Sequence, residues 1–494
     1  MNTALYVKRF EASGTADVSE DVLLPDYLPE IRRVVGVQAS VTADGKYLSG
    51  ENLEADGGVT YTVLYTTPDG TLAHLSETTS YTGHIPLRTE DERYGTADIV
   101  LGASIDNVNC RVTAPRKITL SSKVKLTAFS QKSADVSLRV ENPTGDEEKT
   151  VRRRVKNAAT SCMTELRQSG ETGGELRERE DMRLVCASGS LCISDVRTDP
   201  GNSRAVQIKG DAYVTALLCA PDGTYTVSKS RAPMEESIPL PEHTGEGEQL
   251  SPAVFGKVIV LEMEGGADGC FAWKLEYDID CVLVHTAEGE ITADAYLPGQ
   301  RDTLTVQEVK TCVPAAAVNG RLTTSAAVSL RPDCSFVCAW GTGTVDQAEI
   351  TGTGGGKRLH LGGSVRLCAV TANGEEFFLD ETVIPLRYDC DALPKSGEGG
   401  QFSGRIAVDV TEITARPDGN TLHLTAELGI TAALLGEETH AAAVLLTPDP
   451  DGKLPAGRNR MTVYVPDAEE SAWDVEKRFR LGREAVKDGN AYVI

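Results

Sequence analysis

One sequence motif, called the hairpin phrase below, occurs three times in this chain. It consists of an alternating strand, a tight turn and then Ile-Pro-Leu. The copies comprise residues 59–65, 68–70 and 85–87; residues 212–218, 221–223 and 238–240; and residues 365–370, 373–374 and 384–386. The turn glycines Gly70, Gly223 and Gly374 are 153 and 151 residues apart, a spacing typical of single β-domains. The repetition predicts three tandem domains of one fold.

Each copy continues with a similar outline. An acidic, Gly-rich connector follows each Ile-Pro-Leu, at residues 89–95, 242–247 and 396–400. Further strands then alternate apolar and polar residues, most clearly at 117–126, 273–282 and 422–428. A period of two is typical of antiparallel sheets with one face in water, and the Pro-Asp-Gly and Asn-Gly turns suit hairpins. The predicted fold class is mostly β, with three antiparallel β-sandwich or barrel-like domains.

We place the domain boundaries by composition. The first domain is expected at 1–140, the second at 179–305 and the third at 306–455. Residues 141–178 are highly charged and are interpreted as an exposed linker with room for one helical or edge-strand piece. The basic run at 152–156 within it is interpreted as a solvated face, with docking of an acidic neighbour as the alternative.

The C-terminal residues 456–494 change their periodicity and are predicted to form a small α+β module. Residues 461–465 are expected to form a strand, and 490–494 a closing strand. Between them, Ala472, Val475 and Phe479 recur at helical spacing behind an acidic start, which predicts a short amphipathic helix.

Charge and composition exclude several functions. The formal net charge is −24, and an acidic surface repels nucleic acid and anionic membranes. No run approaches the roughly 20 apolar residues that span a bilayer, and residues 1–10 lack the apolar core of a signal peptide. The twelve cysteines include several set singly in apolar strands, which favours reduced thiols inside a cell.

No motif in the sequence indicates catalysis. The seven histidines lack metal-ligand spacing. Residues 351–358 superficially resemble a phosphate loop, but Thr351 replaces the first glycine and Arg358 replaces the hydroxyl residue that holds magnesium. The sequence therefore predicts no catalytic residue, no cofactor, no metal site and no enzyme activity.

Two Pro-acid pairs near the N-terminus suggest a family. Pro25, Asp26, Pro29, Glu30 and Ile31 match a motif of the form P-D-x-x-P-D-I, with Glu30 in place of the second Asp. With the hairpin phrase, this Pro-acid motif resembles the SPOCS domain of spore-forming Firmicutes, over roughly residues 1–450. The second and third units resemble the family through the hairpin phrase alone.

The tail resembles a shortened LysM module. Its helix, residues 470–479, matches the LysM pattern through Ser471, Trp473, Asp474, Arg478 and Phe479, and the resemblance implies that these five bind a partner. The usual Asn-rich loop is missing, which favours contact with protein over glycan.

Together the two resemblances imply a non-enzymatic spore-coat assembly protein. Its expected place is the mother-cell cytoplasm at the forespore surface, and its expected partners are the basement-layer ATPase of the coat and coat proteins. Self-assembly into a fibre or layer through exposed strand edges is an alternative. Peptidoglycan binding through the tail is another.

Overall fold

The computed structural model describes residues 5–87, 99–134, 136, 138–140, 152–199, 204–241, 249–265, 268–352, 356–393, 402–453, 463–466, 470–481, 486–488 and 491–493. The three acidic connectors predicted from the sequence lie outside these residues. The described part is almost entirely β-strand with one short helix, so the predicted mostly-β fold class is confirmed.

The strands form three bodies of the same design. Body 1 comprises β1 (Leu5–Leu23), β2 (Arg33–Val41), β3 (Gly45–Ser49), β4 (Asn52–Thr66), β5 (Leu72–Pro86), β6 (Ile99–Ala114) and β7 (Lys117–Ala134). Body 2 comprises β9 (Arg152–Arg177), β10 (Arg183–Asp199), β11 (Ala205–Cys219), β12 (Tyr225–Pro239), β13 (Gln249–Gly265) and β14 (Cys270–Tyr296). Body 3 comprises β15 (Gln300–Ser329), β16 (Ser335–Thr351), β17 (Arg358–Asn373), β18 (Glu376–Asp391), β19 (Ser403–Asp418) and β20 (Thr421–Lys453).

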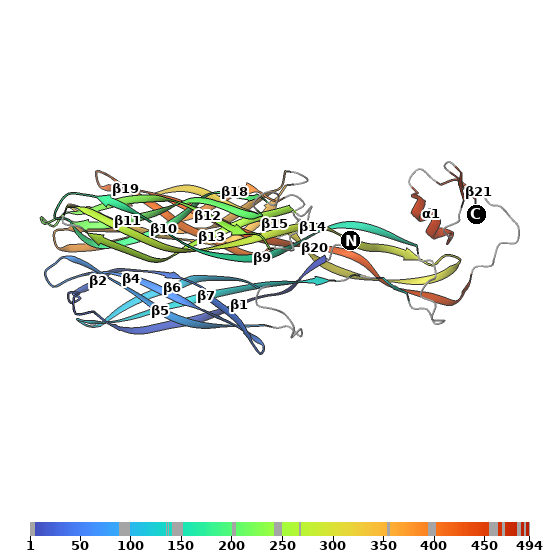
Figure 1. Cartoon of the computed structure of the whole chain (residues 1–494), viewed down its shortest axis with the longest axis horizontal. Coiled ribbons are helices and arrows are strands. Elements are labelled where there is room, and N and C mark those ends of the chain that lie inside the picture. Colours follow the sequence, from blue (N-terminus) through green and yellow to red (C-terminus); the bar gives the residue numbers. More distant parts are fainter. Residues whose placement is uncertain are drawn as a thin grey trace.

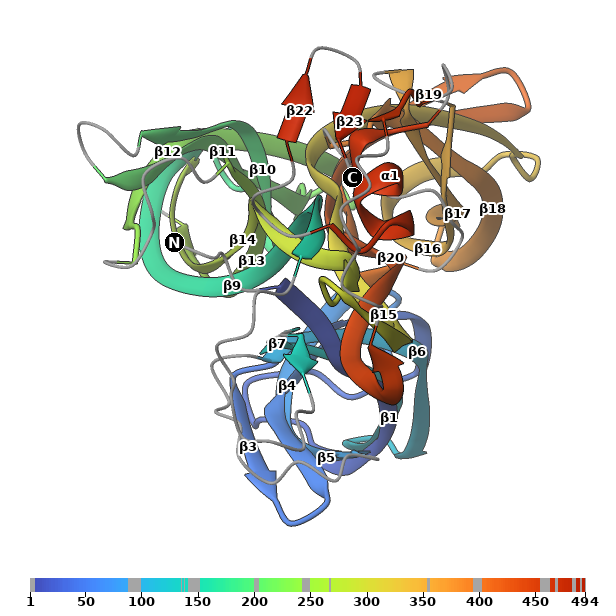
Figure 2. The same cartoon turned by 90° about the vertical axis from the view of Figure 1, so that its right-hand side faces the viewer.

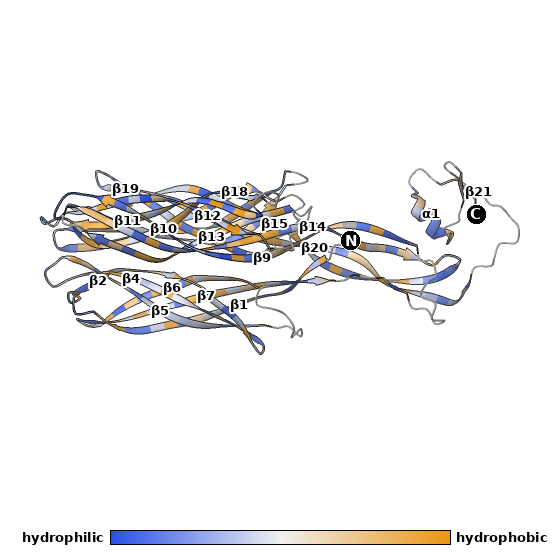
Figure 3. Ribbon diagram, in the orientation of Figure 1, coloured by the Kyte–Doolittle hydropathy of each residue, from blue (hydrophilic) through white to orange (hydrophobic). Residues whose placement is uncertain are grey.

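The strand order is the same in all three bodies. Leaving aside the small extra strand β3, the second, third and fourth strands form one antiparallel sheet, and the fifth, sixth and first form another. In body 1 these halves join where Thr15 of β1 pairs with His84 of β5, which makes a nearly closed barrel. Hydropathy alternates along the strands (Figure 3), because every second side chain faces the core of its body.

The repeated phrase forms the hairpin between the third and fourth strands of each body: β4–β5, β11–β12 and β17–β18. Gly70, Gly223 and Gly374 have φ angles of 82°, 85° and 60° at these turns. Glycine adopts this left-handed region without the Cβ clash of other residues. The predicted hairpins are therefore confirmed.

The segment predicted as a charged linker, with room for one helical or edge-strand piece, contains a long edge strand that belongs to body 2. Its residues 152–177 form β9, the first strand of body 2, and pair with β14 along their whole length. Body 3 likewise begins with β15 at Gln300, a few residues before the predicted boundary. An edge strand exposes much of its surface, so β9 can carry many charges. Its amino-acid composition is therefore similar to that of an exposed linker.

The bodies lie side by side around a common axis and not as beads on a string (Figure 2). Each has its own apolar core, and a further cluster lies where all three meet. Val35, Val185 and Val337 each occupy a β-bulge in the second strand of their body, and all three belong to this shared cluster. The symmetry of the repeats therefore extends to their packing.

Hydrogen bonds link body 2 to each of the other two bodies. Gln131 of body 1 donates to the carbonyl of Met163 in body 2 at 3.0 Å. The Asn319 side chain of body 3 accepts from the Val254 amide of body 2 at 2.8 Å. The bodies thus form one continuous unit.

Beyond the bodies the molecule narrows into a stalk (Figure 1). The outer halves of β9, β14, β15 and β20 extend past the barrels, and the short strand β8 (Arg139–Val140) pairs in parallel with β20. Small apolar clusters fill this stalk, the first of them around Leu5, Ala158, Ile291 and Ala442.

The C-terminal module lies at the far end of the stalk (Figure 1). It contains β21 (Val463–Tyr464), α1 (Ala472–Arg478), β22 (Val486–Asp488) and β23 (Ala491–Val493), with the strand order β21-β23-β22. Within the described residues, no helix has the length and apolar character needed to cross a membrane.

Candidate functional site

The Pro-acid motif is the connection between β1 and β2, and it closes one end of body 1. Ile31 is buried and its amide donates to the carbonyl of Pro115 at 2.8 Å. The guanidinium of Arg116 donates to the carbonyls of Leu28 and Pro25 at 3.1 and 2.9 Å. The motif therefore carries a structural role that its sequence did not reveal.

The acidic residues of this motif point outward. Asp26 is fully exposed, with its carboxylate 3.9 Å from Arg116, and Glu30 is exposed as well. The carbonyl of Pro29 accepts from the Tyr65 hydroxyl at 3.1 Å, and Pro25 is half-buried. Only the exposed edge of the motif, including Tyr27 at 83% exposure, is open to a partner.

In the C-terminal module, two of the predicted partner-binding residues cap helix α1. The Ser471 hydroxyl accepts from the Asp474 amide at 3.3 Å, and the Asp474 carboxylate accepts from the Ser471 amide at 3.1 Å. This reciprocal capping box satisfies two amides that a helix start leaves free. The Ser471 hydroxyl also donates to the Asp474 carboxylate at 2.5 Å, and this bond together with the one from the Ser471 amide holds the pKa of Asp474 below its usual range.

Two others pack inside the module. Phe479 stands edge-on to the ring of Tyr464, with centroids 4.9 Å apart. Arg478 donates to the Tyr464 hydroxyl at 2.9 Å and pairs with Glu470 at 3.0 Å. Together with buried Val475, these contacts stabilise the helix against β21.

Trp473 instead faces the stalk. Its indole N–H donates to a carboxylate oxygen of Asp294 at 2.9 Å, and Lys477, one helical turn later, pairs with the same carboxylate at 2.6 Å. The Trp473 ring also lies 5.3 Å from the ring of Tyr296. The residue expected to bind a partner is therefore engaged within the chain.

Further contacts hold the module in place. Arg480 pairs with the nearly buried Asp302 at 2.7 Å, and the Tyr296 hydroxyl donates to the carbonyl of Leu481 at 3.0 Å. Partial burial opposes ionisation of Asp294, but Lys477 and Trp473 overcome this and lower its pKa. A β-bulge at Thr292–Asp294 directs the Asp294 side chain.

The structure thus divides the five predicted tail residues. Ser471 and Asp474 cap the helix, Arg478 and Phe479 pack within the module, and Trp473 alone contacts the stalk. Sequence reasoning missed Lys477, Asp294 and Tyr296. Lys477 had a detectable signal, because it follows Trp473 by one helical turn, but Asp294 had none.

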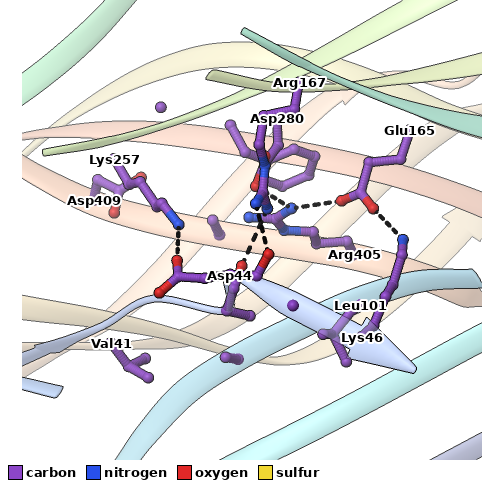
Figure 4. Close-up of a pocket in the computed structure, with 16 residues that line it drawn as sticks. Val41, Asp44, Lys46, Leu101, Glu165, Arg167, Lys257, Asp280, Arg405 and Asp409 are labelled. Atoms are coloured by element: carbon purple, nitrogen blue, oxygen red, sulfur yellow. Dashed lines mark hydrogen bonds and ion pairs between the residues drawn. The ribbon is translucent and has the colours of Figure 1, made fainter. Parts of the chain in front are cut away.

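A cavity of about 350 Å³ lies where the three bodies meet. Figure 4 shows charged side chains from all three around it. The Asp280 carboxylate of body 2 is at its centre and accepts from Arg167 at 2.7 Å and from Arg405 of body 3 at 3.0 Å. Cations from body 2 and body 3 therefore share one buried carboxylate.

Body 1 joins the same network. Arg167 also donates to the carbonyls of Asp44 and Ala43, each at 3.1 Å. Lys46 pairs with Glu165 at 2.6 Å, and Lys257 with Asp44 at 3.0 Å. Seven charged side chains in this cavity thus bind one body to another.

Two carboxylates of the cavity have opposite pKa shifts. Burial opposes ionisation of Asp280, but the charges of Arg405 and Arg167 outweigh it and lower its pKa. Asp409 is exposed to the cavity, but the protein around the cavity replaces part of the water that would solvate its carboxylate, and this desolvation raises its pKa to about 6. We assign the difference to the direct cationic partners that Asp280 has.

The chemical role of the charged side chains in this cavity is to join the three bodies. Among the described residues, no three His, Cys, Asp or Glu side chains are placed to hold a metal ion. Lys46, Lys257 and Arg405 each pair with an acid of a neighbouring body, which suits structural linkage.

Comparison of the chain with known protein families, curated proteins and solved structures finds no match to any of them.

Proposed function

We propose that this chain is a non-enzymatic scaffold that assembles the protein coat of a bacterial spore. The proposal rests on one observation, which is that the Pro-acid motif and the C-terminal module lie in separate parts of the molecule. The Pro-acid motif closes a barrel in the three-body head, while the LysM-like module sits at the tip of the stalk (Figure 1). A molecule with distinct surfaces at two ends suits a protein that links one layer to another, since linked weak contacts gain avidity.

In this proposal the tail module contacts the basement-layer ATPase of the coat and the three bodies recruit coat proteins. The protein would act in the mother-cell cytoplasm at the forespore surface. Ser471, Asp474 and Arg478 are the exposed members of the predicted set, and their outer surfaces would meet the partner.

A binding measurement with the purified ATPase tests this function. The full chain is expected to bind, and a chain that lacks residues 461–494 is expected to lose binding. An Arg478→Ala variant should bind more weakly, with Arg111→Ala on the outer face of body 1 as the control. Equal binding by the truncated and full chains would exclude the tail as the contact.

Two parallel measurements separate the alternative functions. Electron microscopy across concentrations would reveal fibres or layers if the chain self-assembles. Sedimentation with insoluble peptidoglycan would reveal glycan binding, for which Trp473 would have to leave its contact with Asp294.

A further inference from the structure

The stalk carries an unusual concentration of positive charge on one strand edge. Arg153, Arg154, Val155 and Lys156 are all exposed. Among the strands that the structure describes, β9 is the last of its sheet and pairs only with β14 there. The backbone N–H and C=O groups that point away from β14 therefore present a free edge. We call Arg153, Arg154 and Lys156 the basic edge.

The charges of the basic edge are not neutralised within the described part of the chain, where none of the three forms an ion pair. Their neighbours across the ladder are Ala295, Asp294 and Ile291 respectively. Asp294, the single acid among these, already binds Trp473 and Lys477. Asp474 of α1 feels the field of Arg154, but its carboxylate caps the helix.

Edge strands often carry charge simply to prevent aggregation. A single cation on the edge is enough to prevent aggregation, whereas three cations within four residues repel one another. Elsewhere in this chain, the cations Arg167, Lys257 and Arg405 are matched to acids. An uncompensated cluster in a chain of net charge −24 therefore favours an external acidic occupant.

We propose that the free edge of β9 at residues 153–156 binds an extended acidic segment of a partner protein, which adds as a strand to the sheet. The backbone of the segment would pair with β9, its carboxylates would meet the basic edge, and exposed Val155 would contact an alternate side chain. This surface is separate from the tail contact of the proposed function and does not depend on it.

The probe is a capped peptide of about ten residues, a typical strand length or slightly more, with alternating Glu and Thr. A second peptide of equal charge alternates Glu and Pro, because proline cannot donate to a ladder. A single-stranded oligothymidylate of similar length tests nucleic acid. Binding to the full-length protein is measured by fluorescence anisotropy at low and physiological salt.

Two triple variants complete the design. The test variant replaces Arg153, Arg154 and Lys156 with Gln. The control makes the same charge change on body 1, at Arg111, Lys123 and Lys125, which are exposed. Circular dichroism and thermal unfolding confirm that both remain folded.

We expect the Glu-Thr peptide to bind the wild-type protein and the control alike. Because Arg154 and Lys156 share the face that the Glu side chains would line, loss of the basic edge should weaken its binding by roughly tenfold or more in the test variant, and the Glu-Pro peptide should bind several-fold more weakly. Equal loss in both variants, equal binding of the Glu-Pro peptide, or comparable binding of the oligothymidylate would each overturn the proposal. So would the absence of peptide binding at low salt.

Discussion

The ring of Tyr225 stands edge-on to the ring of Phe377, with centroids 5.7 Å apart and planes at 81°. Tyr225 is the first residue of the fourth strand of body 2 and Phe377 is the second residue of the fourth strand of body 3, so both follow the repeated turn. Leu72 holds the corresponding place in body 1, and its amide donates to the Tyr225 hydroxyl at 3.0 Å. The repeated hairpin therefore builds the contact among the three bodies as well as the core of each.

Removing the Tyr225 hydroxyl should weaken this junction. In Tyr225→Phe the ring contact is kept, but the Leu72 amide loses its acceptor, at a cost of about 1–3 kcal/mol for a buried polar group. Urea unfolding should show the loss, while Tyr213→Phe on the neighbouring strand should change little. Equal stability of Tyr225→Phe and wild type would show that water replaces the hydroxyl.

Asp280 should matter more to stability than the outer members of its network. Asp280→Asn leaves Arg167 and Arg405 without their shared carboxylate, and breaking such a buried pair costs about 3 kcal/mol. Lys257→Met breaks a pair with the more exposed Asp44 and should cost less than about 1 kcal/mol. Chemical denaturation of both variants checks the order, and a reversed order would contradict a central role for Asp280.

Asp409 should make the protein less stable as pH rises. Its folded pKa of about 6 lies above the ordinary value of 3.8, so the folded state holds a proton that the unfolded state releases. Its stabilising contribution is complete at low pH and is lost as pH rises towards 6. Asp409→Asn should flatten this part of the profile and raise stability at neutral pH.

Unfolding of wild type and Asp409→Asn at pH values between 4 and 7 isolates that contribution. Asp418→Asn, at the exposed end of the same strand, provides the matched control. Parallel profiles for wild type and Asp409→Asn would contradict the assigned shift.

Asp294 should hold the C-terminal module against the stalk. Asp294→Asn removes the charge that binds Lys477, with an expected loss of roughly 1–2 kcal/mol because the pair is partly exposed. Amide hydrogen exchange should quicken in α1 and remain unchanged in the three bodies. Glu290→Gln, an equal charge change at an exposed position of β14, should leave α1 protected, and similar exchange in both variants would contradict the assignment.

The hairpins, the alternating strands and helix α1 were predictable because their signals are local. A glycine at a turn, a period of two and a Ser-x-x-Asp cap each act over a few residues. The sequence left room for an edge strand at residues 141–178 but did not place β9 in body 2, because its charges resemble those of a linker and its pairing partner β14 lies about a hundred residues away.

The site was less predictable than the fold. Ser471, Trp473 and Asp474 were identified from the sequence, yet their roles in capping and stalk contact depend on geometry. Trp473 meets Asp294, and Arg405 meets Asp280, across 179 and 125 positions of the chain. No spacing rule connects residues so far apart.

The amino-acid sequence by itself determined that this protein has three copies of one β-unit and a short helical tail, because repetition and periodicity are properties of neighbouring residues. Only the tertiary structure decided that the units surround one axis, that they share a charged cavity, and that the tail rests on a stalk. Those features arise from burial and charge pairing between distant side chains, whose free energies depend on where the folded chain brings them.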